Sequence, residues 1–74
     1  MTTDEIIRVM TRERERQGIS YKQLQIKSGV ELHTVAKWVC GAARPRLDVL
    51  IDVLDALGLE LVLRRKRDAG QDMR

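Results

Sequence analysis

The chain has 74 residues, which is enough for one small domain whose hydrophobic core is marginal by itself, so dimerisation is an expected source of stability. A net charge of +3 fits a nucleic-acid-binding protein without requiring one, whereas an aromatic content of 3% argues against a single-strand binder that stacks bases on aromatic rings. One cysteine and one histidine exclude a disulfide within the chain and a cysteine-based zinc site, so no metal is expected.

The sequence also lacks the features of a membrane protein or an enzyme. No apolar run approaches the length that spans a bilayer, and the polar N-terminus is unlike a secretory signal, so we expect a cytoplasmic protein without a membrane partner. There is no serine, histidine and aspartate set for nucleophilic catalysis, no carboxylate pair flanking a plausible pocket and no glycine-rich phosphate loop. We therefore expect neither catalysis nor a cofactor.

The first predicted element is a helix that starts at a cap formed by Thr3 or Asp4 and runs to about Arg16. Gly18 should end it. The apolar stripe of this helix is short, and residues 11–17 are all polar. This polar stretch predicts a solvated face or a surface for phosphates.

Two short helices with a tight glycine-containing turn between them are expected next. Ser20 is a good N-cap for a helix from Tyr21 to Ser28, because Gln23 completes the capping-box pattern. After a turn that contains Gly29, a third helix is expected from Leu32 to Cys40. This third helix should bury its two larger apolar residues, Val35 and Trp38.

A fourth helix is expected from about Leu47 to Leu57, with Gly58 as its C-cap. Residues at helical spacing form a strong apolar stripe along it, namely Leu47, Leu50, Ile51, Leu54 and Leu57, and Val53 widens this stripe.

The residues after Gly58 change from helical spacing to a period of two. Leucines alternate with other residues from Leu59 to Arg64, which predicts a strand. A lone strand has unpaired backbone groups, and no other strand is expected in the chain. We therefore expect this strand, residues 59–64, to pair with the same strand of a second copy in a homodimer, through Leu59, Leu61 and Leu63. Residues 65–74 should form a basic flexible tail.

Residues of the second and third helices and their surroundings stand in a recognisable order. They are Ser20-Tyr21-Lys22-Gln23-Leu24, Ser28-Gly29-Val30, Val35-Ala36-Lys37-Trp38, Gly41, Arg44-Pro45, Leu47, Leu50 and Ala56-Leu57-Gly58. This order resembles the Cro and phage-repressor type of helix-turn-helix domain, also called the xenobiotic-response-element type, over roughly residues 10–59. The resemblance implies that the third helix enters the major groove of double-stranded DNA.

The resemblance also implies roles for particular residues. Those expected to meet base edges are Leu32, His33, Thr34 and Lys37. Those expected to approach phosphates are Arg14, Tyr21, Lys22, Ala43 and Arg44. By their chemistry, Lys37 can donate to guanine, His33 can donate or, when neutral, accept, and Leu32 suits a thymine methyl.

Three departures from the family's pattern are visible. Val39 stands where the family usually has a glutamate that pairs with the arginine matched by Arg14, so Arg14 should be held differently. Glu31 takes the position of the usual serine or threonine cap of the recognition helix. The strand replaces a frequent fifth helix, which is similar to the antitoxin branch of the family.

The sequence as a whole predicts an all-α, four-helix helix-turn-helix domain, residues 1–64, with a short C-terminal strand that pairs across a homodimer. Its expected function is sequence-specific binding to a palindromic operator as a transcriptional repressor. One alternative is an antitoxin that regulates its own operon and binds a partner toxin. Another is a protein-interaction module that keeps the fold and does not bind DNA.

Overall fold

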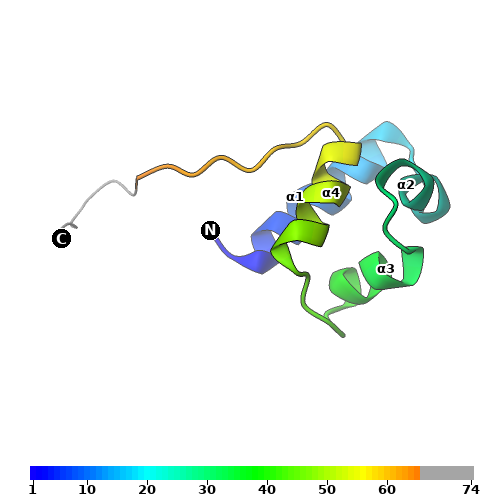
Figure 1. The fold of residues 1–74 in the computed structure, drawn as a ribbon, viewed down its shortest axis with the longest axis horizontal. Coiled ribbons are helices and arrows are strands. Elements are labelled where there is room, and N and C mark those ends of the chain that lie inside the picture. Colours follow the sequence, from blue (N-terminus) through cyan, green and yellow to red (C-terminus); the bar gives the residue numbers. More distant parts are fainter. Residues whose placement is uncertain (66–74) are drawn as a thin grey trace.

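The computed structural model of the protein describes residues 1–65 and contains four helices in this part of the chain. They are α1 (Thr3–Gln17), α2 (Tyr21–Ser28), α3 (Leu32–Cys40) and α4 (Leu47–Ala56) (Figure 1). The predicted all-helical architecture is confirmed, and α2 and α3 have the predicted bounds. None of the helices in residues 1–65 is long and apolar enough to cross a membrane. Most of the predicted flexible tail, residues 66–74, lies outside the described residues.

Two of the helices begin with capping boxes. The Ser20 hydroxyl accepts from the Gln23 N–H (3.1 Å), and the Gln23 side chain accepts from the Ser20 N–H (2.8 Å), as the sequence predicts. At the start of α1 the cap is Thr2, and the prediction of Thr3 or Asp4 is wrong. Thr2 is selected because Glu5 stands three residues later and accepts from the Thr2 N–H at 2.6 Å.

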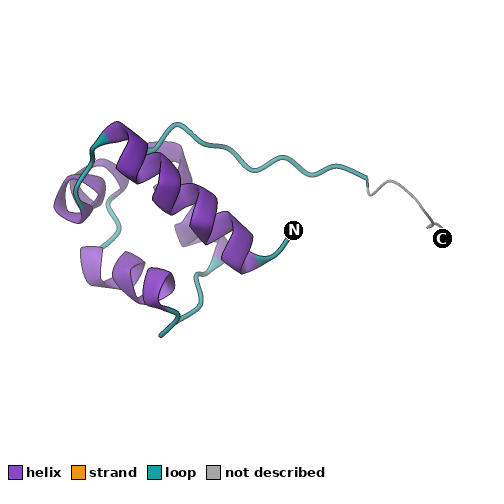
Figure 2. Ribbon diagram, turned by 180° about the vertical axis from the view of Figure 1, so that it is seen from behind, coloured by secondary structure: helices purple, strands orange, loops and turns teal. Residues whose placement is uncertain are grey.

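All four helices contribute to one hydrophobic core. α2 packs against both α3 and α4, and α1 packs against α3, as Figure 2 shows from the opposite side. Trp38 is buried in this core, as expected. The buried residues are Ile7, Met10, Ile19, Leu24, Val30, Val35, Trp38, Leu50, Val53, Leu54 and Leu57.

The buried face of α4 is narrower than the sequence predicts. Leu47 is 63% exposed and Ile51 is 39% exposed, although both belong to the predicted apolar stripe. Leu47 opens the helix, and its exposure means that the neighbouring helices do not extend over the first turn. Ile51 lies one position beyond Leu50, which turns it by about 100° away from the core. Val53, which the sequence adds to this stripe, is fully buried as expected.

The chain leaves α4 through a turn at Gly58. Gly58 has a φ of 78°, and the Leu59 N–H donates to the Leu54 carbonyl oxygen at 2.8 Å, which closes the end of the helix. Residues 59–65 then follow an extended path that leads away from the helices after Leu61 (Figure 1), without a strand partner among the described residues. The predicted strand pairing requires a second chain and stays a prediction.

Leu24→Ala should lower the free energy of unfolding by about 2–5 kcal/mol, because Leu24 is fully buried and the shorter side chain leaves a cavity. Ile26→Ala on the same helix is a control, since Ile26 is 74% exposed and its loss should change stability by less than about 0.5 kcal/mol. Urea unfolding followed by circular dichroism measures both. Similar losses in the two variants would contradict the orientation of α2.

Candidate nucleic-acid interface

The turn between α2 and α3 is held by hydrogen bonds that set where α3 begins. Gly29 ends α2 with a φ of 77°, in the left-handed region that glycine adopts without strain. The Ser28 hydroxyl accepts from the N–H of the buried Val30 at 3.1 Å. The Gln25 side-chain oxygen accepts from the Leu32 N–H at 2.9 Å, and this N–H belongs to the first turn of α3, which lacks helical partners. Side chains of α2 therefore fix the start of α3.

One face of α3 packs into the core and the opposite face is open to solvent. Val35 and Trp38 are buried, whereas His33 and Lys37, which lie one turn apart, are exposed. The remaining residues predicted to contact bases, Leu32 and Thr34, are half-buried at the two borders of this face. Of the four predicted residues, His33 and Lys37 share the exposed face of α3, and Leu32 and Thr34 flank it on either side.

Glu31 caps α3 and also orients the ring of His33. One carboxylate oxygen accepts from the Thr34 N–H (3.2 Å), and the other lies 2.7 Å from His33 Nδ1. An ionised carboxylate can only accept, so Nδ1 carries the proton, and this hydrogen bond lowers the pKa of Glu31 below its ordinary value.

The pairing with Glu31 leaves His33 Nε2 as the ring nitrogen that can meet a ligand. When the ring is neutral, Nε2 is an acceptor and suits the amino groups of adenine N6 or cytosine N4. When the ring is protonated, Nε2 is a donor and suits guanine O6 or N7. Toward a ligand, Nε2 can therefore act as an acceptor or as a donor.

Arg14 joins the end of α1 to the start of α2. Its guanidinium donates to the Ile19 carbonyl oxygen (2.7 Å) and lies 4.3 Å from the centre of the Tyr21 ring. A carboxylate oxygen of Glu15 is 3.9 Å away, while α3 presents Val39 where the resemblance expects a glutamate. The structure therefore shows Arg14 and Tyr21 in contact with each other. Their contacts with phosphate stay predictions.

The loop after α3, residues 41–46, contains two of the residues predicted to contact phosphate. The N–H groups of Ala42 and Ala43 donate to the Lys37 carbonyl oxygen at 2.9 and 3.2 Å and close the end of α3. A phosphate contact by the Ala43 N–H would compete with this bond. Arg44 is exposed, as is Lys22 in the first turn of α2, so both cations are placed at the surface where they can reach an anion.

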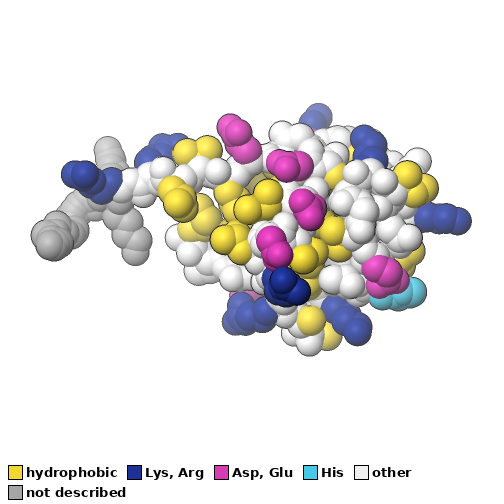
Figure 3. All heavy atoms as spheres, viewed as in Figure 1, with side chains coloured by type: hydrophobic (Ala, Val, Ile, Leu, Met, Phe, Trp, Pro, Cys, Tyr) yellow, Lys and Arg dark blue, Asp and Glu magenta, His cyan; other side chains and the backbone are white. Residues whose placement is uncertain are grey.

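Acidic side chains gather on another part of the surface, along α4. Asp48, Asp52 and Asp55 recur at helical spacing and are all exposed. Figure 3 shows acidic side chains in a row across the face that α4 occupies, with lysine and arginine side chains around the edges. A polyanion would be repelled from this row and would approach another side of the molecule.

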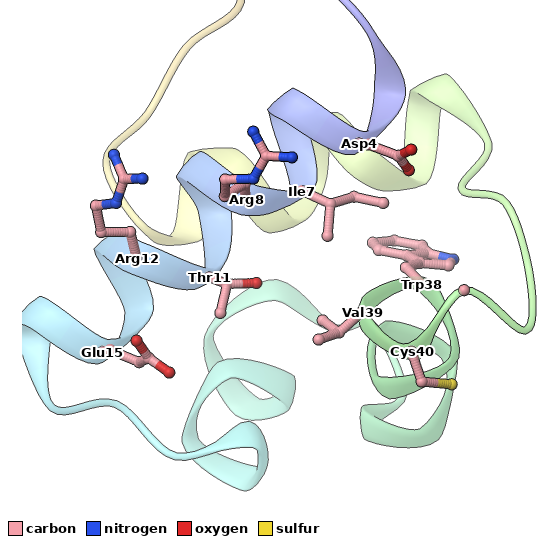
Figure 4. A pocket seen from close by; sticks show the side chains of 10 residues that line it. Asp4, Ile7, Arg8, Thr11, Arg12, Glu15, Trp38, Val39 and Cys40 are labelled. Atoms are coloured by element: carbon pink, nitrogen blue, oxygen red, sulfur yellow. The ribbon is translucent and has the colours of Figure 1, made fainter.

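An open groove of about 470 Å³ lies between α1 and the C-terminal end of α3 (Figure 4). Ile7, Trp38 and Val39 supply its apolar lining, while α1 contributes both signs of charge through Asp4, Arg8, Arg12 and Glu15. The two arginines point away from α3 in Figure 4. Because the lining carries both signs of charge, the groove favours neither anions nor cations. Within residues 1–65, no three histidine, cysteine, aspartate or glutamate side chains are grouped so that they could hold a metal ion.

Comparison with known proteins identifies no relative. No family model matches the chain, and no curated protein or solved structure matches it. The resemblance to the Cro and phage-repressor type therefore depends on the residues of the chain itself.

Arg14→Met should lower the free energy of unfolding by about 1–2 kcal/mol, because the Ile19 carbonyl oxygen loses its donor and Tyr21 loses the stacked guanidinium. Arg12→Met is the matched control on the same helix, since Arg12 is exposed, and it should change stability by less than about 0.5 kcal/mol. Chemical denaturation measures both. An unchanged stability of Arg14→Met would show that this arginine does not join α1 to α2.

Proposed function

We propose that the protein is a sequence-specific regulator that binds double-stranded DNA as a homodimer and represses transcription from a palindromic operator. The observation that carries this proposal is the surface of α3, on which His33 and Lys37 are exposed one turn apart. The opposite face of this helix packs into the core through Val35 and Trp38. A single helix fits the major groove, where each base pair presents a distinct pattern of donors and acceptors.

Different groups supply specificity and affinity in this proposal. Lys37 donates to guanine O6 or N7, and His33 uses Nε2 for a neighbouring base edge. Neither side chain makes the bidentate contact of an arginine, so each half-site is moderately specific. Arg44 and Lys22 neutralise phosphates and contribute affinity that does not depend on sequence. The acidic row on α4 supports the proposed orientation, because it favours an approach of DNA from another side.

A second copy of the chain is part of the proposal. Residues 60–64 are extended and have unpaired backbone groups within the described chain, and Leu59 and Leu61 are half-buried against the helices. Pairing of this segment with its counterpart gives a symmetric dimer with two copies of α3. Such a dimer suits two half-sites about 34 Å apart, and its presence on a promoter would exclude RNA polymerase.

Lys37→Ala and His33→Ala should each weaken binding to a duplex site selected by the wild-type protein by about 1–3 kcal/mol, since each loses a base contact. Both side chains are exposed, so stability should not change. Lys27→Ala is a matched control, because Lys27 is an exposed lysine on the last turn of α2 and its substitution removes the same charge. Fluorescence anisotropy at one fixed salt concentration measures all three, since counterion release makes the affinity depend on salt.

If Lys37→Ala bound the selected site as tightly as the Lys27→Ala control, α3 would not be the recognition helix. If the wild-type protein selected no duplex site, the domain would be a protein-interaction module.

A further inference from the structure

Apolar surface remains open beside the segment that follows α4. A groove of about 200 Å³ lies there, with Glu5 and Glu60 among apolar lining residues Met1, Ile6, Val9, Leu54, Leu59 and Leu61. Along the same segment, Val62 is 53% exposed and Leu63 is 96% exposed. The groove and these two exposed apolar residues on the same segment together form the kind of apolar surface that marks an interaction site.

The chain's own residues 62–65 are poorly placed to cover this groove. They continue along the extended path away from the helices (Figure 1), and Arg64 is about 20 Å of extended chain beyond Gly58. None of residues 59–65 is a glycine, proline, asparagine, aspartate or serine, so this described part of the segment lacks the residue types that favour a turn. In a dimer with a two-fold axis, residues 62–65 of the second copy run in the opposite direction and can reach the groove of the first copy without any turn.

The leucine pattern specifies where this axis lies. Leu59, Leu61 and Leu63 share one face of the extended segment, and the pattern is symmetric about Leu61. Antiparallel pairing about Leu61 places Leu63 of the second copy opposite Leu59, on the same face. Because Leu59 lines the groove, the exposed Leu63 of each copy then covers the groove of the other.

The opposite face of the same pairing brings unlike charges together. It carries Glu60, Val62 and Arg64, all exposed, and Glu60 also borders the groove. In the register centred on Leu61, Glu60 lies opposite Val62 of the second copy and diagonal to Arg64 of the second copy, within reach of long side chains. The two Glu60 carboxylates also approach each other across the axis, so each needs a cation nearby.

We propose that the C-terminal segment of a second copy docks antiparallel along this groove, with Leu63 inserted into it and Arg64 paired with Glu60 across the interface. The inference rests on the proposed homodimer and adds its register and its charge pairing. It also assigns a role to Arg64, whose pairing with Glu60 favours a second copy of this chain in the antiparallel orientation.

Sedimentation equilibrium of the full-length chain, without DNA, tests the pairing. Arg64→Glu and Glu60→Arg should each weaken the dimer at least about tenfold, because both cross-chain pairs become like-charged. An equimolar mixture of these two variants should form a heterodimer about as tight as the wild type, since each acid again meets a base. The double variant Glu60→Arg/Arg64→Glu should restore the homodimer, which also shows that the substitutions allow folding.

Arg65→Glu is the matched control. It makes the same change of charge one residue later, on the leucine face, and should leave the dissociation constant within about threefold of the wild type. The proposal is overturned if the mixture and the double variant do not restore the dimer, if Arg65→Glu weakens it as much as Arg64→Glu, or if the wild type is monomeric. Since no DNA is present, a failure of DNA binding would not alter these results.

Discussion

The orientation of α3 is the constraint on which the rest of the structure depends. α3 has nine residues, which is too short for a helix to be stable in water by itself. It persists because Val35 and Trp38 are buried in the core and because Gln25 on α2 binds its first turn. The contacts that stabilise α3 occupy one side of it and thereby fix which side faces solvent. The exposed positions of His33 and Lys37 follow from this packing.

The core connects α3 to the start of the C-terminal segment. α2 packs against both α3 and α4, so the end of α4 is fixed relative to α3. The Gln17 side chain of α1 also donates to the Leu57 carbonyl oxygen at 2.8 Å, immediately before the segment begins at Gly58. In the proposed dimer, this connection means that the pairing of residues 59–64 sets the distance between the two copies of α3.

The parts of the fold that depend on local chemistry could be predicted from the sequence. Ser20 and Gly29 bound α2 because capping and left-handed backbone are properties of single residues and their near neighbours. The exposure of Leu47 and Ile51 could not be predicted, since it depends on how far the other helices extend. The contact of Arg14 with the next turn is equally a matter of tertiary geometry. The outward face of α3 was predictable because two buried positions define its opposite side, whereas the identity of its ligand depends on a molecule outside the chain.

Selection of bound sites from random duplex DNA tests the central claim most directly. The account predicts enrichment of a two-fold symmetric site whose half-sites are centred about 34 Å apart, one helical turn, because two copies of α3 would enter successive major grooves on one face of the duplex. Recovery of no enriched duplex, or of a site without symmetry, would contradict it.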